Sequence, residues 1–76
     1  MLTWHEVKST SIRAIGDDPD TKRAYVEYLR RRGPYVYERV PSEVYGGLER
    51  ADRRRPYVNR VIKQYQYEYL GRWPEN

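Results

Sequence analysis

The chain has 76 residues with 15 Lys+Arg against 11 Asp+Glu, nine Tyr and two Trp, but neither Phe nor Cys. Its length indicates one small domain that buries about 60% of the surface of its unfolded chain, and the missing cysteine excludes disulfides, thiolate metal sites and a thiol nucleophile. No run approaches the ~18 apolar residues of a membrane span and the first residues lack a secretory pattern, so we expect a cytoplasmic protein. Residues 1–76 are predicted to be a single domain, in which residues 1–6 and 70–76 are the segments expected to be loosely ordered tails.

The first half of the chain is predicted to form a three-stranded antiparallel meander. Strands are expected where β-branched or alternating apolar residues occur, at residues 9–15, 24–29 and 35–39. Ile12 and Ile15 are three apart, which breaks strict alternation and indicates a bulge. The Gly, Asp and Pro residues at 16–21 predict the first turn. Ala24 is expected on the inner face, because Glu27 occupies the other.

A first helix is predicted for residues 42 to 50 or 51, after the Val40-Pro41 pair. Val44 and Leu48 lie one turn apart, so they are expected to pack on Tyr35 and Tyr37, which share one strand face. Gly46 and Gly47 each weaken a helix by about 1 kcal/mol relative to Ala. Such a pair is tolerable where another backbone approaches the helix closely.

A second helix is predicted to begin at Pro56 and to end near Gln66, followed by an extended tail that packs Tyr67 or Tyr69. Its buried stripe is expected to consist of Tyr57, Val61, Ile62 and Tyr65. The predicted fold class is therefore α+β: a three-stranded antiparallel meander with two C-terminal helices packed on one face.

Several motifs, in this order and spacing, resemble the KTSC domain family over residues 4 to about 65. They are Trp4…Val7-x-Ser9-x-x-Ile12-x-x-Ile15-Gly16-x-Asp18, Val26-x-Tyr28, Tyr35-x-Tyr37, Val40-Pro41-x-x-Val44-Tyr45-x-x-Leu48 and Tyr57-x-Asn59. The family takes its name from the C-terminus of some lysyl-tRNA synthetases and also occurs as free-standing small proteins of bacteria and phages. The resemblance thus implies a bacterial or phage-encoded protein and suggests RNA as a partner. Where the family tends to carry Ser and Gly before the Tyr57 motif, this chain has three arginines.

Positive charge is concentrated between residues 50 and 63, which hold six basic residues and one acid. Arginine forks match phosphate oxygens, and a tyrosine beside them can stack on an unpaired base. The candidate nucleic-acid-binding residues are Arg50, Arg53, Arg54, Arg55, Tyr57, Arg60 and Lys63. A secondary basic cluster, Arg30, Arg31 and Arg32, is predicted at a hairpin tip, where it extends the same surface if the two lie close. The alternative for both clusters is a solvated surface whose arginines pair with nearby acids.

Other constellations favour structural roles. Tyr35 and Tyr37 are interpreted as core residues, which leaves Tyr25 and Tyr67 as the better candidates for exposed stacking rings. The acids at 17, 18 and 20 fit turn chemistry, because the twelfth residue from Asp18 is Leu29 and not the carboxylate that a calcium loop requires. The single histidine, His5, has no nucleophile motif beside it.

We therefore expect a non-enzymatic binding module with no catalytic residues, metal, cofactor, small-molecule substrate or membrane partner. The first hypothesis is contact with RNA or another nucleic acid through the basic residues, without base-specific readout. The second is a protein-interaction module, such as a phage or bacterial regulator, that binds a protein partner or self-associates through its Tyr-rich surface.

Overall fold

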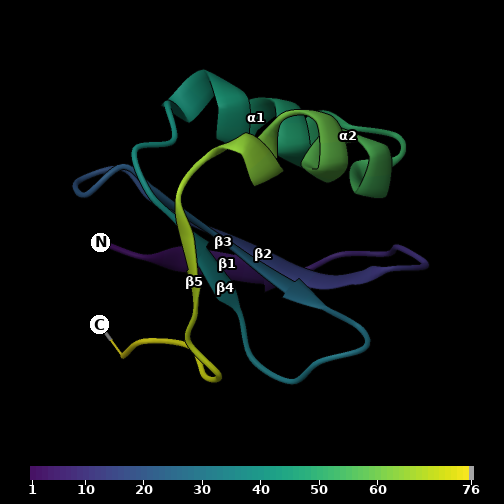
Figure 1. The fold of residues 1–76 in the computed structure, drawn as a ribbon, viewed down its shortest axis with the longest axis horizontal. Helices are drawn as coiled ribbons and strands as arrows, with labels where there is room; N and C mark the ends of the chain where they lie inside the picture. The colour runs from purple at the N-terminus through teal and green to yellow at the C-terminus, as the bar shows by residue number, and fades with distance from the viewer. Residues whose placement is uncertain (76) are drawn as a thin grey trace.

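A computed structural model of the protein describes residues 1–75. Five strands form one antiparallel sheet in chain order, with α1 and α2 on one face and the C-terminal segment beneath the other (Figure 1). The elements are β1 Thr3–Glu6, β2 Ile12–Asp18, β3 Arg23–Tyr28, β4 Tyr35–Tyr37, α1 Ser42–Arg50, α2 Arg54–Arg60, the 3₁₀ turn η1 Ile62–Gln64 and β5 Tyr67–Tyr69.

The α+β class and the antiparallel sheet are as predicted, but the prediction of three strands was wrong. The predicted meander is the centre of the sheet, β2–β3–β4, and a short strand is added at each edge. All four residues of β1 are exposed, so no alternation of buried and exposed side chains marks it in the sequence. Strand β5, which was expected only as an extended tail, pairs Tyr69 with Tyr35 and Tyr67 with Tyr37.

Strand β2 contains the predicted irregularity, because its register against β3 shifts between Ile12 and Ala14. Ile12 and Ile15 are both fully buried in the same core cluster. The bulge therefore reconciles their spacing of three with a single buried face.

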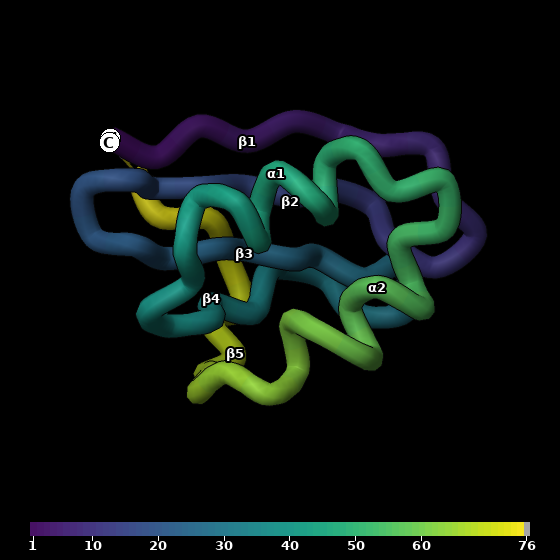
Figure 2. The backbone as a smooth tube through the Cα atoms, turned by 90° about the horizontal axis from the view of Figure 1, so that it is seen from above, coloured from purple at the N-terminus to yellow at the C-terminus, as the bar shows by residue number. Residues whose placement is uncertain are grey.

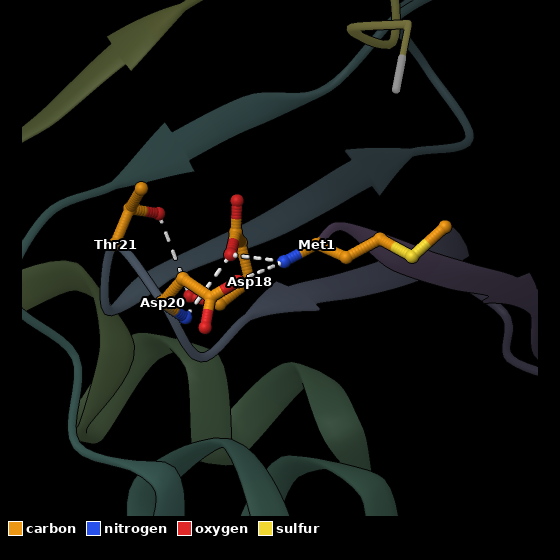
Figure 3. Close-up of polar contacts among 4 residues, drawn as sticks. All are labelled: Met1, Asp18, Asp20 and Thr21. Atoms are coloured by element: carbon orange, nitrogen blue, oxygen red, sulfur yellow. Dashed lines mark hydrogen bonds and ion pairs between the residues drawn. The ribbon is translucent and has the colours of Figure 1, made fainter.

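The first turn begins later than predicted, because β2 continues to Asp18. The side chain of Asp18 accepts a hydrogen bond from the Asp20 amide at 3.1 Å, and Lys22 takes a φ of 56°. The Met1 ammonium also contacts Asp18 at 3.1 Å and Asp20 at 2.5 Å (Figure 3). The acids thus serve turn chemistry, as predicted, and in addition hold the start of the chain.

The helices cover a core of aliphatic residues and tyrosines. Tyr37 is 2% exposed and packs with Val26, Leu48 and Ile62, while Tyr35 and Val44 are half-buried at the margin of this cluster. The predicted packing of the first helix on the tyrosine face is confirmed.

The second helix differs from its prediction in length and in buried stripe. Regular α2 ends at Arg60 and passes into η1, so it does not reach Gln66. Val58 and Ile62 are the fully buried pair, whereas Val61 is half-buried. Val58 thus takes the buried place that was predicted for Val61, whereas Ile62 is buried as predicted and Tyr57 and Tyr65 pack against the core.

The opposite face of the sheet is also covered. Leu2, Tyr25 and Val36 form a second buried cluster with Leu70 and Trp73 packed against it. Tyr25 is only 4% exposed, so its prediction as an exposed stacking ring was wrong. The reason is that residues 70–75 fold back beneath the sheet (Figure 1).

A buried carboxylate holds this C-terminal segment. Glu27 is 7% exposed and accepts hydrogen bonds from the Trp73 indole N–H at 2.8 Å and the Gly33 amide at 2.9 Å. The indole also stacks on Trp4, with ring centroids 4.7 Å apart. Glu27 faces away from the helices, as predicted, yet it is inside the protein.

Candidate nucleic-acid interface

Three connections meet at one end of the molecule. The β1–β2 connection, the β3–β4 connection and the connection between α1 and α2 lie at the same end in two perpendicular views (Figures 1 and 2). Antiparallel neighbours bring alternate loops to one end of a sheet, and α1 runs along the sheet to reach the same end. This arrangement brings together basic residues that are far apart in the sequence.

A pocket of about 810 Å³ lies between these segments, and we call it the tyrosine pocket. Its basic residues come from both predicted clusters: Arg30 and Arg31 from the β3–β4 connection, Arg55 from α2 and Lys63 from η1. Its remaining lining residues are Thr10, Ser11, Leu29, Tyr28, Tyr35, Tyr37 and Tyr67, with no acid among them. The two basic clusters therefore do lie side by side.

A second pocket of about 560 Å³, which we call the arginine pocket, continues this surface and shares Thr10, Ser11 and Arg55 with the first. Its other lining residues are Lys8, Ser9, Asp52, Arg53, Arg54 and Pro56. Among the residues that the structure describes, Asp52 is thus the single acid that lines either pocket. The combined surface extends from the β3–β4 connection across the β1–β2 connection to the start of α2.

The predicted residues of the 50–63 segment do not all lie on this surface. Arg50 lines neither pocket, and its guanidinium lies over Gly46 on α1. Arg60 and Tyr57 line neither of these two pockets but an adjoining one of about 490 Å³, which shares Asp52, Arg53 and Pro56 with the arginine pocket. In the hairpin, Arg32 lines neither the tyrosine nor the arginine pocket, and its backbone carbonyl accepts a hydrogen bond from the Tyr69 hydroxyl.

Tyr57 connects the two helices, which was not foreseen. Its hydroxyl donates a 2.7 Å hydrogen bond to the Val44 carbonyl, and its ring lies against Gly47, where a Cβ would be 2.3 Å from the hydroxyl oxygen. The group that approaches α1 closely at Gly47 is therefore the side chain of Tyr57 and not, as expected, another backbone. A half-buried ring engaged in this way is less accessible to a base than the sequence indicated.

The cations of the tyrosine pocket are not neutralised by carboxylates. Within residues 1–75 the ion pairs involve the Met1 ammonium, Arg13 and Arg23, and none involves a residue of this pocket. Arg31 donates to the Tyr35 hydroxyl at 2.9 Å and lies 3.7 Å from the Tyr69 ring centroid. It is thus held by neutral partners and keeps its charge for a ligand.

Arg54 has a structural role as well. It donates to the Glu49 carbonyl at 2.8 Å, near the C-terminal end of α1. Its Nε is buried and has no hydrogen-bond partner in the part of the chain that the structure describes. A buried donor of this kind normally has an acceptor, and Arg54 lines the arginine pocket.

Two tyrosine hydroxyls meet in the tyrosine pocket. The Tyr28 and Tyr37 oxygens are 2.9 Å apart, and burial raises the pKa of both hydroxyls above their ordinary value. Both are therefore neutral at physiological pH and share one hydrogen bond. Lys63 lies beside them, with its Nζ 5.9 Å from the Tyr28 ring centroid.

Several residues of this surface were not among the sequence candidates. Lys8, Thr10 and Ser11 precede β2, and nothing local distinguishes them from an ordinary polar connection. Tyr67 is 61% exposed, in agreement with its prediction as a candidate stacking ring. Its ring is tilted against Tyr35 and Tyr37, with centroid distances of 5.9 and 5.8 Å.

Residues 1–75 offer no candidate for a metal site or a membrane-spanning helix. No group of three or more His, Cys, Asp or Glu side chains is placed to hold a metal ion. No helix combines the length and apolar character that crossing a membrane demands.

Comparison with known proteins shows a family for the chain. The family model described as the KTSC domain matches residues 8–67. A protein of Stutzerimonas stutzeri (strain A1501), named as an uncharacterized protein, is 36% identical over 63 residues, covering 83% of this chain and 87% of that protein. The crystal structure of a KTSC domain protein from Yersinia pestis aligns with a TM-score of 0.86 and 26% identity over 93% of this chain and 100% of that one.

Proposed function

The chain belongs to the KTSC domain family, and we propose that it is a non-enzymatic module that binds single-stranded RNA or another single-stranded nucleic acid. The observation that carries this proposal is the tyrosine pocket, where four basic residues from two separate segments line one pocket with no acid. The family resemblance supports the same class of partner, because the domain takes its name from the C-terminus of some lysyl-tRNA synthetases.

The composition of the surface suits a single strand. Phosphate contacts by Arg and Lys supply affinity that is independent of sequence, and exposed aromatic rings stack on unpaired bases of any type. Lys8, Arg53 and Arg55 extend the positive charge of the tyrosine pocket along the arginine pocket, while Tyr67 offers an exposed ring. The hydroxyls of Thr10 and Ser11 lie where the two pockets meet and can donate to phosphate oxygens.

The binding surface proposed here is a revision of the sequence candidates. Arg53, Arg54, Arg55 and Lys63 are retained, and the hairpin residues Arg30 and Arg31 join them. Arg50 is left out because it lies elsewhere on α1, and Arg32 because it lines neither pocket. Tyr67 replaces Tyr57 as the proposed stacking ring.

The test compares two double variants that remove the same charge. Arg55→Ala with Lys63→Ala removes two cations of the tyrosine pocket, and Arg50→Ala with Arg72→Ala removes two exposed cations outside both pockets. Binding of a fluorescent single-stranded oligouridylate is measured by anisotropy over a range of salt concentrations. For single strands each lost phosphate contact reduces the slope of log K against log salt by about 0.7, so the first variant should lose about 1.4.

The second variant should keep the wild-type slope and lose little affinity. Equal losses in both variants would show that binding follows net charge and not this surface, and would contradict the proposal. Tyr67→Leu should weaken binding by about 1–3 kcal/mol through lost stacking, with unchanged salt slope.

A second candidate function is favoured by a different observation. Strand β5 is an edge of the sheet, and Tyr67 on it is exposed. Unpaired edge strands can pair with another chain, so self-association through the Tyr-rich edge is the competing proposal. Sedimentation equilibrium distinguishes them: a dimer that Tyr67→Lys dissociates supports self-association, and a monomer at all concentrations removes it.

A further inference from the structure

We propose that the tyrosine pocket takes the terminal phosphate monoester of a nucleotide, together with the nucleoside that carries it. This inference deepens the proposed function and rests on it, because it assigns one part of the binding surface to the end of a strand. The argument has three steps, which concern the charge of the pocket, its hydroxyl pair and its size.

The charge of the pocket is more concentrated than a continuous strand requires. An internal phosphodiester carries one negative charge, whereas a phosphate monoester carries about −1.5 to −2 at pH 7. Arg30, Arg31, Arg55 and Lys63 line a single pocket, and within the first 75 residues none has a carboxylate ion-pair partner. A dianion compensates more of this positive potential than a diester does.

The hydroxyl pair leaves one proton to be donated. When Tyr28 and Tyr37 share their 2.9 Å hydrogen bond, one hydroxyl donates and the other retains its own proton. Neither oxygen makes a second hydrogen bond to a residue in the described range 1–75. Because both side chains line the pocket, the remaining O–H is a donor for an acceptor-rich ligand such as a phosphate.

The size of the pocket fits more than an isolated anion. Pockets for small ligands measure roughly 300–1,000 Å³, and about 810 Å³ lies within this range. The exposed ring of Tyr67 is part of the same wall and supplies a face on which a base can stack. The terminal phosphate and its base can therefore be held together, with Arg31 already positioned by Tyr35 and Tyr69.

The experiment uses the full chain and four probes. Three are oligouridylates of one length, with a 5′ phosphate, with a 3′ phosphate, or with hydroxyls at both ends, and the fourth is free uridine monophosphate. A charge-assisted hydrogen bond contributes enough for about tenfold or more in affinity. We therefore expect one phosphorylated oligonucleotide to bind at least about tenfold more tightly than the unphosphorylated one. Inorganic phosphate should compete with the terminal phosphate for the pocket and so reduce this difference in affinity.

Two variants locate the effect. Tyr28→Phe combined with Tyr37→Phe removes both hydroxyls and with them the proton left for the ligand. This double variant should reduce binding of the preferred phosphorylated probe several-fold while leaving the unphosphorylated probe unchanged. Arg30→Ala, an exposed change that leaves the core intact, should act in the same direction and covers the case in which the double tyrosine variant fails to fold. Arg72→Ala is the matched control and should not alter the preference.

The outcomes separate this inference from the proposed function. Equal binding of all three oligonucleotides, weakened by Arg55→Ala with Lys63→Ala, overturns the terminal-phosphate site and leaves nucleic-acid binding standing. Binding of uridine monophosphate that depends on Arg30 and on the hydroxyls of Tyr28 and Tyr37, without binding of any oligonucleotide, supports the site and overturns the proposed function. Failure of all four probes to bind at low salt overturns both.

Discussion

Gly46 and Gly47 are neighbours in α1, and replacing each with alanine should have opposite effects on stability. At Gly47 an added Cβ would lie 2.3 Å from the Tyr57 hydroxyl oxygen and 2.8 Å from Cζ of the same ring. At Gly46 the nearest atom is Arg50 Nη1 at 3.0 Å, the far end of an exposed and flexible side chain. The pair therefore tests the contact between the two helices with a control one residue away.

The magnitudes follow from three contributions. Gly→Ala within a helix gains about 1 kcal/mol of helix propensity, and this gain applies to both positions. At Gly47 the ring of Tyr57 must move, which costs about 1–3 kcal/mol of overpacking and about 1 kcal/mol for the hydrogen bond to the Val44 carbonyl. Gly47→Ala should therefore destabilise the protein by about 1–3 kcal/mol, whereas Gly46→Ala should stabilise it by up to about 1 kcal/mol.

Urea denaturation followed by tryptophan fluorescence measures both free energies of unfolding. In a domain of this size each kcal/mol shifts the melting temperature by about 4–8 °C, so thermal melts provide a second readout. In a Tyr57→Leu background the crowding is removed, and Gly47→Ala should become neutral or stabilising. If Gly47→Ala in the wild-type background is as stable as Gly46→Ala, then Tyr57 does not pack against α1 as described.

Three further predictions concern the core, the C-terminal segment and pH. Val58→Ala should destabilise the protein by about 2 kcal/mol or more and Val61→Ala by clearly less, because Val58 is fully buried and Val61 is not. Urea denaturation measures both free energies of unfolding, and equal effects would refute the buried stripe described for α2. Glu27→Leu should cost at least about 2 kcal/mol, because the Gly33 amide and the indole N–H each lose the carboxylate oxygen that accepts their hydrogen bond. Glu27→Gln should cost less but not be neutral, because its single carbonyl oxygen can accept only one of these two hydrogen bonds. The urea midpoint and the tryptophan emission maximum measure this, and an unchanged emission in the leucine variant would contradict it. The third prediction is that stability decreases slightly at both pH extremes. The N-terminal ammonium lowers the pKa of Asp18 by a hydrogen bond, and hydrogen bonds to Asp20 and Asp18 raise the pKa of the ammonium above 8.0.

The sign of the pH effect is different for the two groups. A carboxyl whose pKa is lowered on folding contributes stability above its unfolded value of 3.8, and this is lost as the pH falls through the folded pKa. An ammonium whose pKa is raised contributes stability below 8.0, and this is lost as the pH rises through the folded pKa. The Met1 ammonium is exposed, so solvent screens the interaction and the effect is small. Acetylation of the N-terminus should abolish the alkaline part, and an identical pH profile in the acetylated protein would exclude the interaction.

The sequence by itself determined the elements that are rich in β-branched residues or whose apolar residues recur at a regular spacing. Strand β2 was predicted from its β-branched residues. Strands β3 and β4 and helix α1 were predicted from apolar residues two apart, such as Tyr35 and Tyr37, or four apart, as Val44 and Leu48 are. The bulge in β2 was predicted for the same reason, since the spacing of Ile12 and Ile15 conflicts with a regular strand. The substitution of tyrosine for the absent phenylalanine is also visible in composition and is confirmed at Tyr37, which is 2% exposed.

Only the tertiary structure decided what covers the second sheet face and which cations share a surface. Trp73 is 46 residues from Glu27, and no local pattern indicates that its indole closes over a buried carboxylate. Arg31 and Lys63 likewise become neighbours through the antiparallel pairing and the path of α1, not through their sequence spacing. Short-range periodicity reports which side of an element is buried, but loop ends and edge strands are positioned by long-range contacts, and the proposed binding surface consists mainly of loop ends.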